Sequence, residues 1–84
     1  MPYIKSIDRK KFETLLSALR EVKFESSGEL NFVLTKTVHH YLGSSPSYAS
    51  FNDVLGALEG AKLELYRRRI APYEDKKILE NGDL

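Results

Sequence analysis

The residue range 51–71 constrains the fold more than any other part of the sequence, because it is the longest stretch with helical periodicity. Val54, Leu58, Ala61 and Leu65 follow one another at intervals of three and four residues and so form one apolar stripe. Three more residues widen the apolar arc to nearly half of the helix circumference: Leu55, Leu63 and Ile70. Such an arc is wider than a surface helix needs to cover one core. The sequence therefore predicts a helix that packs against more than one partner.

Small residues in the same stretch point to close packing of its backbone. Gly56 and Gly60, with Ala57 and Ala61, give two pairs of small residues spaced by four. Each internal glycine costs a helix about 1 kcal/mol relative to alanine, so a partner helix or a ligand is expected to approach there. We favour a partner helix, because an 84-residue chain has a marginal core and oligomerisation commonly compensates for that. The prediction is a homo-oligomer packed through this helix.

Two shorter periodic stretches precede it. The first runs over Asp8–Val22, with the Asp8 side chain as the expected N-cap. The second begins with the capping-box spacing of Ser26 and Glu29 and ends at Gly43, since glycine enters the left-handed cap conformation without a Cβ clash.

The long helix is predicted to begin with a capping box of Ser50 and Asp53 and to be broken by Pro72, whose ring lacks an N–H and clashes with the preceding turn. A short kinked continuation over Pro72–Glu80 follows, and Asn81–Gly82 ends it. The sequence thus predicts an all-α fold. We expect a single helical domain over residues 1–84, with three main helices and a short C-terminal helix after Pro72.

Composition excludes several classes of protein. The 13 Lys and Arg residues and 12 Asp and Glu residues leave a net charge of +1, which argues against a nucleic-acid partner. The absence of cysteine excludes disulfides, thiolate metal sites and a cysteine nucleophile. No apolar run is long enough for a membrane span, and the opening MPYIKSIDRKK lacks the apolar part of a secretory signal. We expect a cytoplasmic protein with no membrane partner.

Cations and aromatic residues alternate near the end of the long helix. Lys62, Tyr66, Arg69 and Tyr73 would share one ridge if the helix continued past Pro72. Cations bind phosphate oxygens and aromatic rings stack on bases, so the ridge is a candidate nucleotide surface. The alternative is that Lys62 and Arg69 only lay their stems over apolar neighbours and keep their charged ends in water.

The run Arg67, Arg68 and Arg69 makes the range 62–77 locally basic, with six basic and three acidic residues. Neighbouring residues of a helix point in different directions, so the three arginines of one chain cannot all reach one small ligand. Two chains could bring their arginines together around an anion. Without a ligand, the same cations stabilise the C-terminal end of the helix dipole.

No pattern of catalytic or metal-binding residues occurs. His39 and His40 are adjacent, so their side chains point about 100° apart and cannot chelate one metal ion together. The sequence has no Ser-His-Asp order, no phosphate-binding glycine loop and no paired catalytic carboxylates. We therefore predict a protein that is not an enzyme, with no metal and no cofactor. Glu74 and Asp75 beside Lys76 and Lys77 are interpreted as a solvated face, on which Glu74 could orient an arginine.

The residues FNDVLGALEGAKLELYRRRIAPYEDKKILENGD, with the opening PYIKSIDRKKF and the central GELNFVLTKTVHHYL, resemble a family of short proteins of phages, prophages and bacteria. The resemblance spans the whole chain. It implies a compact helical fold and an origin in a virus or mobile element. The family has no settled activity, but one class of small phage proteins consists of homo-oligomers that sequester nucleotide signals of bacterial defence.

That resemblance leads to the first hypothesis, a protein that sequesters a cyclic ADP-ribose-like or cyclic oligonucleotide signal at a subunit interface without turning it over. Its phosphate contacts would be Lys62, Arg67, Arg68 and Arg69, its stacking residues Tyr66 and Tyr73, and its ribose contact Asn31 or Glu29. The alternative is a helical interaction module, an adaptor or inhibitor that docks on a host protein through its apolar arc. A nucleic-acid binder that uses the range 62–77 ranks third, because of the overall charge.

Overall fold

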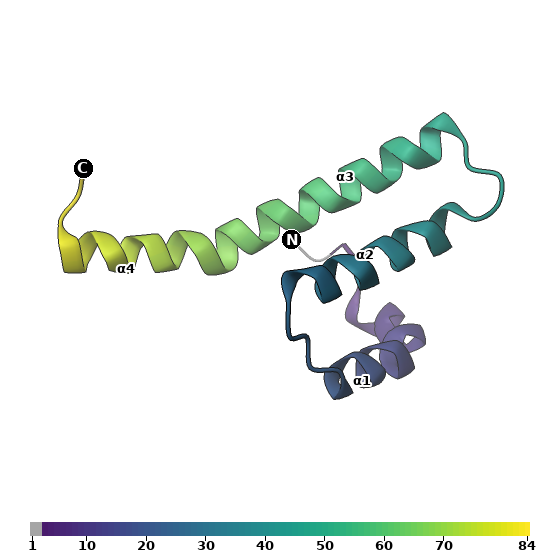
Figure 1. The fold of residues 1–84 in the computed structure, drawn as a ribbon, viewed down its shortest axis with the longest axis horizontal. Coiled ribbons are helices and arrows are strands. Elements are labelled where there is room, and N and C mark those ends of the chain that lie inside the picture. The colour runs from purple at the N-terminus through teal and green to yellow at the C-terminus, as the bar shows by residue number, and fades with distance from the viewer. Residues whose placement is uncertain (1–2) are drawn as a thin grey trace. The chain divides into compact units, whose positions relative to one another are not determined.

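The structure, a computed structural model, describes residues 3–84 and contains helices and no strand in that range, which confirms the predicted all-α fold. The chain divides into two compact units, residues 1–41 and 42–84. Figure 1 draws the first unit in purple to blue and the second in teal to yellow.

The first unit holds a 3₁₀ segment, Ser6–Phe12, and two helices, α1 (Glu13–Glu21) and α2 (Ser27–Leu42). The single helix predicted over Asp8–Val22 is wrong in its first third, because residues 8–12 belong to the 3₁₀ segment. Asp8 lies inside the 3₁₀ segment and its N–H donates to the Lys5 carbonyl at 2.9 Å. Because the tighter 3₁₀ turns begin before Asp8, its side chain cannot serve as the cap of a helix that starts after it.

Helix α2 begins and ends close to the predicted residues. The Ser26 hydroxyl oxygen accepts a bond from the Glu29 N–H at 3.2 Å, as the capping-box spacing predicts. The Glu29 carboxylate accepts its bond from the Glu25 N–H at 3.1 Å, one residue before the N–H expected. Gly43 follows the helix with φ +70°, the left-handed conformation that its position requires.

The second unit is one uninterrupted helical rod over residues 48–81. It consists of α3 (Tyr48–Leu65), a π turn (Tyr66–Ile70) and α4 (Ala71–Asn81). The predicted capping box of Ser50 and Asp53 is wrong, because α3 begins one turn earlier. Ser47 is the N-cap: its hydroxyl oxygen accepts from the Ser50 N–H at 3.1 Å, and the Ser50 hydroxyl oxygen accepts from the Ser47 N–H at 2.8 Å.

Pro72 does not break the rod, contrary to the prediction. The N–H of Ala71 donates to the carbonyl of Tyr66, five residues back, so the chain passes through a wider π turn just before the proline. In an α-helix, the Arg68 carbonyl would have no N–H from residue 72 to accept, and it would clash with the ring of Pro72. The π turn replaces that arrangement, and the rod changes direction there (Figure 1). Gly82, with φ +86°, ends the rod at the predicted place.

None of the described residues 3–84 is buried. Large apolar side chains are exposed in both units, and the exposed fraction is 81% for Ile7 in the first unit and 87% for Leu79 in the second. Apolar residues packed only in part include Phe12, Phe24, Val38 and Val54. Much apolar surface in each unit is therefore left uncovered by the residues of that unit.

No helix within the described range is long and apolar enough to cross a membrane.

We expect Ser47→Ala to lower the free energy of unfolding by about 1 kcal/mol, because the variant loses the acceptor for the Ser50 N–H. Urea unfolding followed by circular dichroism at fixed protein concentration measures the change. Ser45→Ala is the matched control, since Ser45 lies in the same connection and makes no hydrogen bond within residues 3–84. Equal stability of Ser47→Ala and the unmodified protein would contradict this cap.

Candidate functional site

Six of the seven predicted ligand-binding residues lie on the rod of the second unit: Lys62, Tyr66, Arg67, Arg68, Arg69 and Tyr73. The seventh, Asn31, lies in α2 of the first unit, where its side-chain carbonyl accepts a bond from the Thr35 hydroxyl at 3.4 Å. The six residues on the rod are therefore the group whose geometry can be compared.

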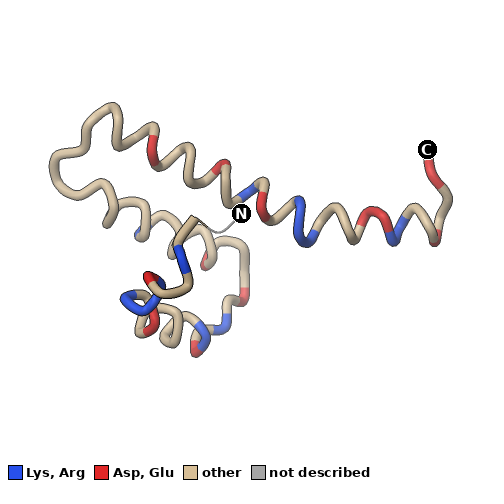
Figure 2. Tube along the Cα trace, turned by 180° about the vertical axis from the view of Figure 1, so that it is seen from behind, with Lys and Arg blue, Asp and Glu red and all other residues tan. Residues whose placement is uncertain are grey.

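Positive charge concentrates around the π turn. The eight residues 62–69 include four basic residues and one acidic residue, whereas the eight residues 70–77 include two of each. Figure 2 shows the corresponding blue segments along the second unit, with red segments between and beyond them. The basic excess predicted for the range 62–77 thus belongs to its first half.

Two of the four basic residues have acidic partners on their own helix. The ammonium of Lys62 lies 3.6 Å from a carboxylate oxygen of Glu59, and Nε of Arg68 lies 3.4 Å from one of Glu64. Both pairs link neighbouring turns, and such exposed pairs contribute little to stability. They agree with the solvated interpretation of Lys62 and partly neutralise Arg68.

Arg67 and Arg69 differ from these two. Neither side chain makes an ion pair or hydrogen bond with any residue of the described range 3–84. The sequence gives the reason, because the one acidic residue within a turn of Arg67 is Glu64, which contacts Arg68, and no acidic residue lies three or four positions from Arg69. Both arginines are exposed, so their guanidinium groups are available to an anion.

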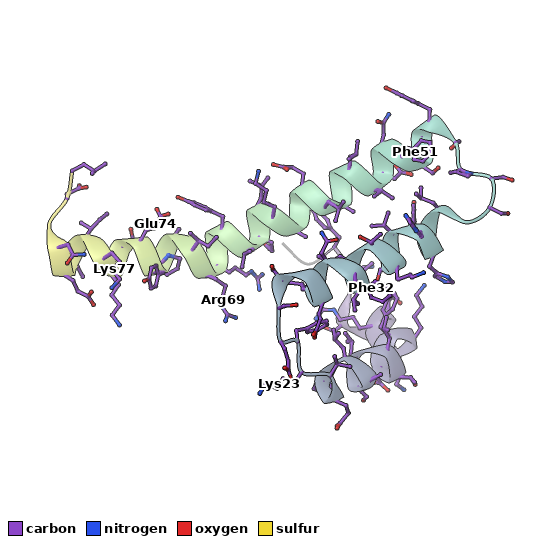
Figure 3. The ribbon with its side chains drawn as sticks, in the orientation of Figure 1. Lys23, Phe32, Phe51, Arg69, Glu74 and Lys77 are labelled. Atoms are coloured by element: carbon purple, nitrogen blue, oxygen red, sulfur yellow. The ribbon has the colours of Figure 1, made fainter. Side chains whose placement is uncertain are left out.

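Arg69 begins a row of three residues spaced by four, Arg69, Tyr73 and Lys77, which we call the basic–aromatic ridge. Figure 3 shows Arg69 and Lys77 projecting from the same side of the rod. The Lys77 ammonium lies 5.5 Å from the centre of the Tyr73 ring and 3.1 Å from a carboxylate oxygen of Glu80. The ridge therefore presents one aromatic ring between two cations.

Sequence reasoning missed Lys77. The signal was present, because positions 69, 73 and 77 repeat every four residues. It could be used only if the helix was known to continue past Pro72.

Tyr66 is turned away from the ridge. Its hydroxyl donates to a carboxylate oxygen of Glu74 at 3.1 Å, and Figure 3 draws Glu74 and Arg69 on different edges of the rod. The prediction that Glu74 could orient an arginine is replaced by this contact with a tyrosine. The hydrogen bond to Glu74, followed by the negative charge of the same carboxylate, raises the pKa of Tyr66 above its ordinary value.

We expect Glu74→Gln to return the pKa of Tyr66 toward its ordinary value of about 10, because a neutral amide does not oppose ionisation of the phenol. NMR of the tyrosine ring carbons during an alkaline titration measures it, and Tyr66→Phe assigns the signal among the five tyrosines. Since the folded-state pKa is raised, the stabilisation by this contact is present at neutral pH and is lost as the pH rises through that pKa. An unchanged titration in Glu74→Gln would contradict the contact.

No group of three His, Cys, Asp or Glu side chains that could hold a metal ion occurs among residues 3–84.

A family model described as Domain of unknown function (DUF6899) matches residues 1–84. No curated protein and no solved structure matches the chain.

Proposed function

The chain belongs to the DUF6899 family, and we propose that it is a non-enzymatic protein that binds a phosphate-bearing nucleotide through the basic–aromatic ridge, in an assembly of several copies. In the fuller form of the proposal the protein is phage-encoded and acts in the host cytoplasm. There it removes a nucleotide signal of bacterial defence, such as a cyclic ADP-ribose derivative or a cyclic oligonucleotide. The resemblance to short phage and prophage proteins supports this fuller form.

One observation carries the binding proposal: the unpaired Arg69 guanidinium lies one turn from Tyr73, whose ring is flanked on the next turn by Lys77. A guanidinium binds phosphate oxygens through two parallel hydrogen bonds. An aromatic ring stacks on a base of any sequence. Phosphate and base are the two chemically distinct parts of a nucleotide, and the ridge offers a partner for each.

Assembly is part of the proposal, because one helix face encloses too little of a ligand. Small-molecule sites surround most of the ligand surface, whereas the Tyr73 side chain is 60% exposed. A further copy of the chain would supply the remaining wall. Support comes from the apolar side chains, none of which is buried within residues 3–84.

Titration calorimetry against cyclic ADP-ribose isomers and cyclic dinucleotides tests the proposal. For the nucleotide that binds, we expect Arg69→Ala and Tyr73→Leu each to raise the Kd about 10- to 100-fold, through loss of a charged hydrogen bond and of stacking. Matched controls are Arg20→Ala and Tyr48→Leu, which change the same residue types elsewhere on the exposed surface and should leave the Kd unchanged. Absence of heat with all of these nucleotides would overturn the proposal.

The second candidate function is a helical interaction module that docks on a host protein. It is favoured by α1 and the residue that follows it, where the apolar side chains are 44–63% exposed: Leu15, Leu16, Leu19 and Val22. Capture of one stoichiometric host protein that is unaffected by Arg69→Ala but is lost with Leu15→Glu would support this function over nucleotide binding.

A further inference from the structure

We propose that two copies of the chain pair antiparallel through one face of α3, with Arg67 of each copy facing Asp53 of the other. This inference rests on the self-assembly part of the proposed function and not on nucleotide binding. It identifies the surface, the partner and the register.

The surface is a row of five residues on α3 and the first turn after it, Asp53, Gly56, Gly60, Leu63 and Arg67, which we call the pairing face. The spacing alternates between three and four residues, so all five share one side of the helix. The positions of the pairing face differ by two residues from those of the predicted apolar stripe, as Gly56 and Gly60 do from Val54 and Leu58. Two residues correspond to about 200° of rotation, so these surfaces lie on nearly opposite sides of α3.

Charge complementarity identifies the partner as a second copy in one orientation. The pairing face carries a negative charge at Asp53 and a positive charge at Arg67, 14 residues or about 21 Å further along the helix. A parallel copy in the same register would place like charges together. An antiparallel copy places opposite charges together at both ends, and a two-fold axis generates both contacts at once.

The same register accounts for the glycines. The residue midway between Asp53 and Arg67 is Gly60, so the two helices cross where each has a hydrogen in place of a side chain. Apart from the adjoining residues and the backbone of the same helix, no atom lies within 4 Å of the position that a Cβ would occupy at Gly56 or Gly60. The helix therefore bears the cost of two glycines without any contact of its own that needs them.

The guanidinium of Arg67 is available for this contact. It makes no ion pair with the described residues 3–84, while Arg68 beside it contacts Glu64. Because Arg69 follows Arg67 by two residues, the basic–aromatic ridge lies on another side of the rod. The pair thus leaves the ridge uncovered, so the wall over a bound ligand would come from a copy outside this pair. Pairing and ligand binding can therefore be altered separately.

Charge reversal with rescue tests the inference, with the native mass of the full chain measured by sedimentation over a concentration series at low salt. We expect Arg67→Asp and Asp53→Arg each to raise the dissociation constant of the pair about 10- to 100-fold, because each creates two like-charge contacts. The double variant Asp53→Arg/Arg67→Asp restores both contacts and is expected to pair as the unmodified protein does. Lys76→Asp, which makes the same change of charge on α4, is the control and should leave the mass unchanged.

A steric variant separates pairing from folding. Gly60→Leu has open space within its own chain and a higher helix propensity, so circular dichroism should show undiminished helicity while the pair dissociates. Three results would overturn the inference: a monomeric unmodified protein, charge-reversal variants that keep its mass, or a double variant that fails to regain it. Nucleotide calorimetry with the unmodified protein remains a separate measurement, so failure of pairing and failure of ligand binding are distinguishable.

Discussion

The helix that passes Pro72 depends on one change of hydrogen bonding, the bond from the Ala71 N–H to the carbonyl of Tyr66 five residues back. A proline inside an α-helix removes a donor and its ring meets the carbonyl four residues earlier. The π turn avoids this conflict and keeps residues 48–81 in one rod. Without that continuity Tyr73 and Lys77 would belong to a separate element, and the basic–aromatic ridge, which begins inside the turn at Arg69, would not exist.

The three consecutive arginines differ in the contacts that are open to them. Arg68 is held by Glu64 one turn back, whereas Arg67 and Arg69 find no partner in the described part of their own chain. These two lie two residues apart, and residues at that spacing face different sides of a helix. Under the two proposals, this run of like charge would serve two contacts without competition, Arg67 with the acidic end of a second copy and Arg69 with a phosphate-bearing ligand.

Features fixed by bonds within one turn could be predicted from the sequence. The helices, the Ser26 contact with Glu29 and the positive φ values of Gly43 and Gly82 follow from such local rules. The start of α3 was predicted wrongly because Ser47 and Ser50 compete with Ser50 and Asp53 at the same spacing, and the backbone entering the helix decides between them. The contact of Tyr66 with Glu74 spans eight residues across a π turn, which an ideal helical wheel cannot place.

The exposed leucines of the rod realise only part of the stabilisation that burial could give. Burying a leucine side chain completely stabilises a protein by about 1.5–3 kcal/mol, while ordering each residue costs about 1–2 kcal/mol of backbone entropy. Leucines that remain 43–65% exposed, as Leu55, Leu58, Leu63 and Leu65 do, realise only part of that stabilisation. The rest becomes available when another molecule covers them. Of these four leucines, the proposed pairing face contains Leu63. If two copies pair as proposed, the population of the helical structure would depend on the concentration of the chain as well as on its sequence.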